Sequence, residues 1–155
     1  MPENTKNYSL IEGVKLHPVY FTWKEKIEGA LPFNFPCFTT HPRSTTNFYD
    51  LNSSELEMYE ETFRKAIKQE IEEFKPDIIH GQHIWILSSI ASEFNIPLVV
   101  TAHGTDIMGY QKDSRFRDYA DKVVDRCKKI ITISKDNDEL VSVSYTHLRA
   151  HETAA

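Results

Sequence analysis

Apolar residues recur at helical spacing in several parts of the chain, most clearly over residues 55–74. A hydrophobic position every three or four residues predicts an amphipathic helix there. Ser54 with Glu57 three positions later fits a capping box at the start of this helix, and Lys75–Pro76 ends it. The same pattern predicts further helices over residues 84–94, from a cap at Asp113 or Ser114 to Cys127, and after a cap at Ser134.

Between these helices lie short apolar runs that are typical of buried parallel strands. The runs are residues 77–80, 98–102 and 130–133. Alternation of strands and helices predicts an α/β fold, a Rossmann-like parallel sheet with flanking helices. The C-terminal ends of parallel strands lie at one edge of the sheet, and open α/β folds bind ligands at that edge. We therefore expect the segments that follow these three runs to share a site.

The first half of the chain gives weaker signals. Residues 14–17 alternate between apolar and polar side chains, which predicts a strand. Residues 29–54 are rich in Gly, Pro, Ser, Thr and Asn, and predict a long irregular connection with one short strand around residues 35–38. Connections of this length are uncommon in compact domains and are often functional.

The segment after the second apolar run carries the strongest candidate chemistry. His103 can direct an imidazole into the crevice, and Gly104 lets a ligand approach the backbone closely. Thr105 adds a hydroxyl group, and the carboxylate of Asp106 could fix the imidazole tautomer or accept a hydrogen bond. We interpret His103 as the candidate catalytic residue and the next three residues as candidate substrate-binding residues. The alternative is a turn, with Asp106 as a helix cap or turn cap.

His80 ends the first apolar run, His83 lies three positions later with Gly81 between them, and Ser134 follows the third run. Their place at the same sheet edge makes His80, His83 and Ser134 candidate substrate-binding residues. A structural role stays open for the two histidines. Their spacing could also ligate zinc together with His103 or Asp106.

Charge and composition narrow the class of partner. Among 155 residues, 18 are basic and 23 acidic, so the formal net charge is −5, which argues against nucleic-acid binding as the main role. Basic residues between Arg115 and Lys129 alternate with acidic ones, as on a solvated helix face, and peripheral membrane attachment is the weaker alternative. The five glycines form no phosphate-binding loop, so the sequence predicts no cofactor.

Cysteine usage and the start of the chain bear on location. Cys37 and Cys127 are 90 positions apart and form no disulfide framework, which favours a reducing compartment. The first residues are polar, and the longest aliphatic or aromatic run is about four residues, from Ile84 to Leu87. We therefore expect a cytoplasmic protein.

Three segments stand out by their order and spacing: KPDIIHGQH at 75–83, IPLVVTAHGTD at 96–106 and IITIS at 130–134. Together they resemble the N-terminal half of family 4 glycosyltransferases, over about residues 12–141. The resemblance implies the GT-B arrangement of two Rossmann-like domains, and retaining transfer of a sugar from a nucleotide-sugar donor to an acceptor, usually without a metal. It also implies that His103 and Gly104 lie near the donor sugar, with His83, Thr105 and Asp106 on the acceptor side.

Parts of the family pattern have no counterpart in this sequence, namely the opening strand with its glycine-rich loop and the second domain that grips the nucleotide. We therefore expect residues 1–141 to be a partial acceptor-side domain, incomplete at its N-terminus and inactive alone. Residues 142–155 include a stretch, Ser144–Thr153, that resembles a translated sequencing adapter. We expect these residues to be a non-native tail, and helix-forming residues there would form a helix whatever their origin.

Two other functions stay open. One is a non-catalytic α/β module that binds a small polar ligand in the same crevice. The other is a metal hydrolase that uses His80, His83, His103 and Asp106.

Overall fold

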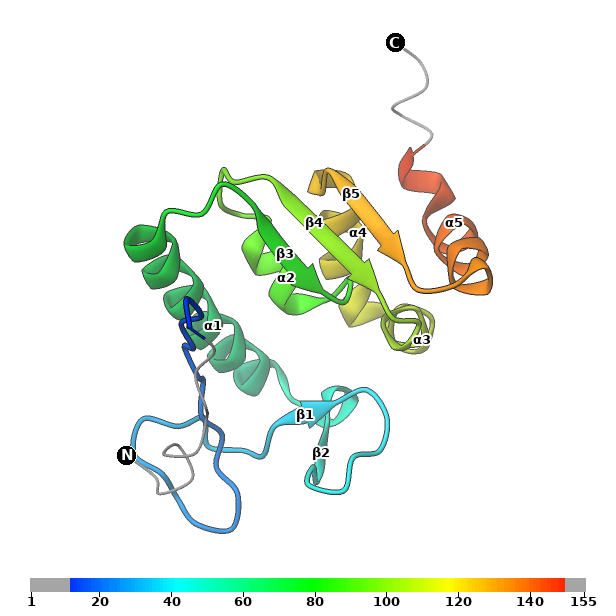
Figure 1. Ribbon diagram of the computed structural model, residues 1–155. Helices are drawn as coiled ribbons and strands as arrows, with labels where there is room; N and C mark the ends of the chain where they lie inside the picture. Colours follow the sequence, from blue (N-terminus) through cyan, green and yellow to red (C-terminus); the bar gives the residue numbers. More distant parts are fainter. Residues whose placement is uncertain (1–11, 150–155) are drawn as a thin grey trace.

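The computed structural model describes residues 12–149, with side chains up to Tyr145. A parallel sheet contains β3 (Ile79–Gln82), β4 (Leu98–Ala102) and β5 (Lys129–Thr132) in that spatial order (Figure 1). The helices are α1 (Ser53–Phe74), α2 (Ile86–Ala91), α3 (Thr105–Lys112), α4 (Arg117–Arg126) and α5 (Lys135–Arg149). The remaining elements are β1 (Pro36–Cys37), β2 (Thr46–Asn47) and two 3-10 helices, η2 (Phe48–Asp50) and η3 (Ser114–Phe116). The predicted Rossmann-like α/β arrangement is confirmed.

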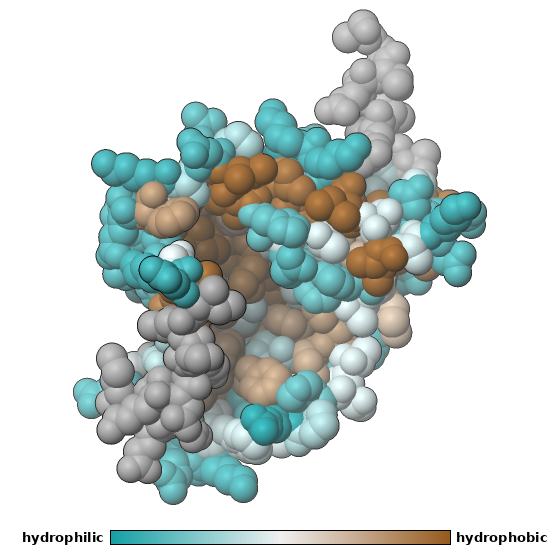
Figure 2. Space-filling model, viewed as in Figure 1, coloured by the Kyte–Doolittle hydropathy of each residue, from teal (hydrophilic) through white to brown (hydrophobic). Residues whose placement is uncertain are grey.

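The two faces of the sheet differ. Helices α2 and α4 cover one face (Figure 1), and Ile79 and Ile130 point into the core beneath them. Among residues 12–149 no helix covers the other face, where Ile78 is 55% exposed and Ile131 is 44% exposed. Apolar side chains gather on this open face in Figure 2. The face therefore presents hydrophobic surface beside the polar residues of the candidate site.

The start of the chain differs from the sequence-based prediction. Residues 14–17 form no strand. Their polar members bind α1 instead, since Lys15 Nζ lies 3.0 Å and His17 Nδ1 lies 2.6 Å from Glu70 Oε1. The alternation therefore reflects contact with a helix, not with a second strand.

The cap of α1 also differs. The predicted pair Ser54 and Glu57 lies inside the helix or its first turn, while Asn52 and Glu55 form the capping box. Asn52 Oδ1 accepts a hydrogen bond from Glu55 N at 3.0 Å, and Glu55 Oε2 accepts one from Asn52 N at 2.9 Å. The same chemistry occurs two residues earlier than predicted, and the helix end at Phe74 is confirmed.

Strand β3 is displaced from the predicted range of 77–80. The ladder with β4 begins where Ile79 N donates to Pro97 O at 2.8 Å and continues to His83 N, which donates to Thr101 O at 2.9 Å. His80 therefore lies inside the strand, opposite Val99, and the prediction that it ends the strand at the sheet edge is wrong. Strand β4 matches its prediction, and β5 begins one residue early, at Lys129.

The helical predictions after residue 83 are confirmed in part. Helix α2 is shorter than the predicted range of 84–94. Asp113 caps η3, which leads into α4, because its Oδ1 accepts from Arg115 N at 3.0 Å. Ser134 Oγ accepts from Asn137 N at 3.1 Å at the start of α5, as predicted. Helix α3 was not predicted, because its first residues were interpreted as candidate site residues, with a turn as the alternative.

Two clusters of buried residues form the interior. The sheet core contains Ile84, Ala91, Leu98, Val100, Ala102, Ile107, Ala120, Val123, Val124, Val141 and Tyr145. The aromatic core contains Leu31, Phe48, Leu51, Leu56, Tyr59, Trp85, Ile86, Ile90 and Phe116. Neighbouring residues at the start of α2 thus enter different cores, since Ile84 packs in the first and Trp85 in the second.

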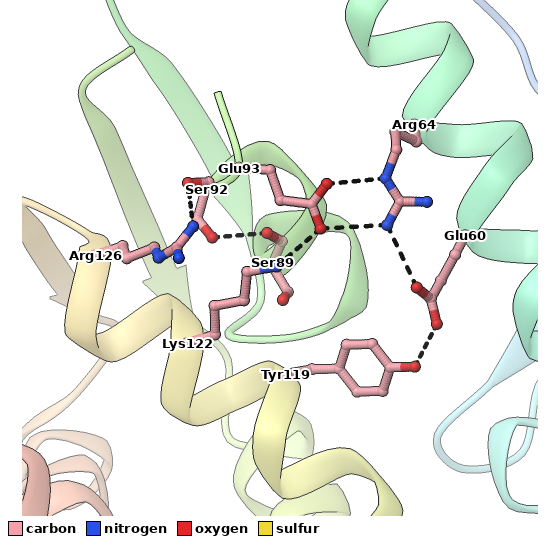
Figure 3. Close-up of polar contacts among 8 residues, drawn as sticks. All are labelled: Glu60, Arg64, Ser89, Ser92, Glu93, Tyr119, Lys122 and Arg126. Atoms are coloured by element: carbon pink, nitrogen blue, oxygen red, sulfur yellow. Dashed lines mark hydrogen bonds and ion pairs between the residues drawn. The ribbon is translucent and has the colours of Figure 1, made fainter. Parts of the chain in front are cut away.

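A polar network on the far side of α2 joins α1 to α4 (Figure 3). Glu93 follows α2 and accepts hydrogen bonds from Arg64 Nε at 2.8 Å and from Lys122 Nζ at 2.8 Å. Arg64 also pairs with Glu60, which accepts a short hydrogen bond from the hydroxyl of Tyr119. The network fixes the spacing of three helices around the covered face of the sheet.

Helix α5 runs through residue 142, where the predicted non-native tail begins. Tyr145 is 1% exposed, and its ring packs edge-on against Tyr110 with centroids 5.0 Å apart. Residues 150–155 lie outside the described residues. Because a helix was expected there whatever the origin of the segment, the non-native assignment stays a prediction.

Candidate functional site

His103 follows the last residue of β4 at the C-terminal edge of the sheet. Its side chain is exposed, and Nε2 lies 2.8 Å from Gln82 Oε1. Because the amide oxygen only accepts, Nε2 carries the proton in this contact, and Nδ1 of the neutral ring is left as an acceptor. Gln82, the last residue of β3, therefore selects the tautomer of His103.

The hydrogen bonds continue from Gln82 along the open face of the sheet. Its amide nitrogen lies 3.5 Å from His80 Nε2, which in turn lies 2.8 Å from Thr101 Oγ1. His80, Gln82 and Thr101 occupy alternate positions on two paired strands, so their side chains share one face. The predicted site residue His80 is thus linked to His103 through Gln82.

His83 packs against His103 from the other side. The two ring centroids are 4.6 Å apart, and the ring of Phe38 lies 5.8 Å from that of His83. The backbone of His83 is left-handed, with φ of 70°, which turns the chain from β3 toward α2. Burial lowers the pKa of His83, the charge of Asp106 opposes this shift, and His103 adds to it. His83 is therefore biased toward the neutral form.

Gly104 and Thr105 join His103 to α3. Gly104 has φ of 90°, a conformation that side-chain-bearing residues rarely adopt, so glycine allows the sharp turn between strand and helix. Thr105 is the half-buried first residue of α3. The turn brings α3 directly against the sheet edge.

Asn137 on α5 holds this turn in place, although its side chain is 5% exposed and lies in another element. With the amide oriented as the donors and acceptors around it require, its nitrogen donates to Ala102 O at 3.0 Å, and its oxygen accepts from Gly104 N at 3.3 Å. These two contacts lie on either side of His103. Asn137 is therefore a positioning residue for the imidazole.

Asp106 has a different environment from the one predicted. Its side chain is 0% exposed, and Oδ2 accepts from Ile84 N at 2.9 Å. The carboxylate thus joins α3 to the start of the α2 segment and is not turned toward His103 for the predicted hydrogen bond. A buried carboxylate in this position stabilises the shape of the site from beneath, and its predicted contact with substrate stays a prediction.

Ser134 is exposed beyond β5, where its hydroxyl caps α5. The structure therefore brings His80, His83 and His103 together, with Gly104 and Thr105 beside them. Ser134 is linked to this group only through Asn137 in the contacts of the described residues. Sequence reasoning missed Gln82 and Asn137, although Gln82 stands between the two predicted histidines.

The geometry bears on metal binding. Among residues 12–149, no three His, Cys, Asp or Glu side chains are placed so that they could hold one metal ion. Asp106, a ligand that the hydrolase alternative would use, accepts a hydrogen bond from the backbone of Ile84.

Residues 12–149 contain no helix that is long and apolar enough to cross a membrane.

Comparison with known proteins supports the family resemblance of the sequence. The family model of Glycosyltransferase Family 4 matches residues 26–142, a range that includes the sheet, the histidine cluster and α3. A search of curated proteins gave no match. With three-quarters of the sequence covered by the family model, the chain belongs to Glycosyltransferase Family 4.

Proposed function

We propose that this chain forms the acceptor-side wall of a retaining glycosyltransferase, which moves a sugar from a nucleotide-sugar donor to an acceptor. A second Rossmann-like domain would hold the nucleotide, and the chain alone would be inactive. The reaction needs no cofactor beyond the donor itself, and the two free cysteines suit a reducing cytoplasm. The observation that carries the proposal is the exposed imidazole of His103, with its tautomer selected by Gln82 and its backbone held by Asn137.

Transfer develops positive charge on the donor sugar as the phosphate group leaves, so catalysis depends on positioning and electrostatic stabilisation. A neutral His103 with its proton on Nε2 offers Nδ1 as an acceptor for a sugar hydroxyl. His83 stacks beside this ring and keeps it from turning, and Gly104 lets the donor approach the backbone. His80 acts through Gln82, so it is a positioning residue in this scheme.

The test is sugar transfer by the complete protein, expressed from the whole reading frame that encodes residues 12–149. We expect His103→Ala to lower turnover by about 100- to 1000-fold while the denaturation midpoint changes little, because the ring is exposed. His17→Ala on the far side of α1 is the matched control and should retain turnover.

Near-normal turnover of the His103→Ala protein would remove the catalytic role. Binding of a small polar ligand without any transfer would favour the non-catalytic module instead. A whole reading frame that encodes no second Rossmann-like domain would favour that module as well.

A further inference from the structure

A hollow lies between α3 and the segment that holds β1 and η2. Its volume is about 320 Å³, and its lining residues are Phe38, Tyr49, Met108, Gln111 and Lys112. Figure 2 shows that the molecule is hollowed between the sheet and this segment. The lining combines two aromatic rings and a thioether with one amide and one ammonium group, which is a surface for a ligand that is part apolar and part polar.

Phe38 connects the hollow to the histidine cluster. Its ring lies 5.8 Å from that of His83 and meets Trp85 edge-on at 4.4 Å, so it is held by the aromatic core. One face of a fixed ring suits the C–H face of a sugar or another apolar group. A ligand seated on Phe38 would therefore lie beside the rings of His83 and His103.

Helix α3 lines the hollow with one stripe. Thr105, Met108 and Lys112 are spaced by three and four residues, so they share a helix face that runs from the sheet edge into the hollow. Gly109 borders this stripe, and its lack of a side chain lets α3 pack closely against Trp85, since an added Cβ would lie 2.7 Å from the indole. Met108 is 55% exposed at the middle of the stripe.

Lys112 supplies the charge. Its Nζ lies 3.9 Å from the centroid of the Tyr49 ring, and no acidic side chain within residues 12–149 forms an ion pair with it. The neighbouring Asp113 is engaged by Arg115, at 2.8 Å. An ammonium group that forms no ion pair among the described residues can bind an anionic group of a ligand through a charge-assisted hydrogen bond.

We infer that this hollow binds the acceptor, and that the acceptor carries an apolar face next to a phosphate or carboxylate group. This inference rests on the proposed function, because it places the ligand one ring away from His103. The apolar face packs on Phe38 and Met108, the anionic group pairs with Lys112, and the free hydroxyl is left toward the histidines. The acceptor is thus an acidic glycoside, sugar phosphate or lipid phosphate rather than a neutral sugar.

The test is a titration of the full chain with phenyl phosphate, phenol and inorganic phosphate, followed by amide NMR signals. We expect phenyl phosphate to bind most tightly and to shift signals of α3 and of the residues around Phe38. Lys112→Gln should weaken its binding about tenfold or more, since it removes a charge-assisted contact. Met108→Glu, at an exposed position, should abolish the binding by repulsion.

Lys65→Gln, on the exposed side of α1, is the matched control and should bind like the unaltered chain. Equal binding by Lys112→Gln and the unaltered chain, or shifts that lie elsewhere, would overturn the inference. Octyl phosphate and glucose 6-phosphate then separate a lipid from a sugar source of the anionic group. Because no donor is present, failure here is distinguishable from failure of the proposed sugar transfer.

Discussion

The side chain of Asn137 brackets His103, since it bonds to the backbone on both sides of that residue. The donor is the amide nitrogen, to Ala102 O at 3.0 Å, and the acceptor is the amide oxygen, from Gly104 N at 3.3 Å. A helix near the end of the chain thus fixes the turn that carries the candidate catalytic imidazole. The relationship links α5 to the site although no residue of α5 was expected there.

Asn137→Ala removes both contacts and leaves two backbone groups unpaired near the site. We expect a loss of about 1–3 kcal/mol in the free energy of unfolding, and faster hydrogen exchange at Gly104 N–H. We also expect lower kcat in the complete protein with little change in KM for the donor. Asn95→Ala, in an exposed turn, is the control. Unchanged exchange at Gly104 would show that Asn137 does not position His103.

Gly109→Ala tests the close packing of α3. The added methyl group would lie 2.7 Å from Trp85 Cη2 and 3.3 Å from Phe38 Cε1. Alanine favours a helix over glycine by about 1 kcal/mol, so any destabilisation must come from packing. We expect a net loss of about 1–3 kcal/mol, measured by urea denaturation. Gln111→Ala on the exposed side of α3 should change stability little, and a gain in stability for Gly109→Ala would contradict the packing.

The network around Glu93 predicts the response to acid. The hydrogen bond from Arg64 is the main cause that lowers the pKa of Glu93 from 4.5 to about 2. Burial opposes this shift, and Lys122 adds to it. A lowered carboxyl pKa stabilises the fold above the unfolded value and loses this effect as pH falls through the folded value. The contribution of Glu93 is therefore complete above about pH 4.5 and is lost toward pH 2.

Glu93→Gln should accordingly cost about 1 kcal/mol of stability at pH 7 and reduce the loss of stability between pH 4.5 and 2. The measurement is urea denaturation across this range. Glu72→Gln, whose ion pair with Lys68 is 3.9 Å long and exposed, is the matched control. Parallel pH profiles for Glu93→Gln and the unaltered chain would rule out this role.

His83 should titrate below the ordinary histidine range, because burial lowers its pKa from 6.5. The unfolded chain then binds a proton at higher pH than the folded chain, so stability should fall as pH drops below about 6.5. NMR titration of the ring Cε1–H signals measures this directly. In His103→Ala the pKa of His83 should rise, because the neighbouring ring that opposes its protonation is gone. A midpoint at or above 6.5 in the unaltered chain would contradict the buried placement.

The sequence predicted the sheet well and the site in part, for physical reasons. Apolar runs such as 98–102 identify strands near the centre of a parallel sheet, and β4 is buried at every position but the half-buried Val99. The end of β3 was misplaced because the apolar residues of the predicted run stop at Ile79, before the polar residues His80 and Gln82. The structure shows instead that glycine makes room for α2, as a Cβ there would lie 2.4 Å from Ser88 Oγ. The role of Asn137 depends on a contact between α5 and the turn after β4, and no local sequence pattern predicts such a contact.

The boundary between the two cores has a consequence for variants far from the histidines. His83 lies where the cores meet, with Phe38 of the aromatic side on one flank and His103 of the sheet side on the other. The distance between the rings of His83 and His103 therefore depends on how the aromatic core packs against the sheet core. The ring of Phe48 packs 5.0 Å from that of Phe38. A substitution at Phe48 can therefore move Phe38 and, through it, the two imidazole rings. If the chain acts as proposed, substitutions in its aromatic interior can thus alter substrate preference while every residue of the site stays the same.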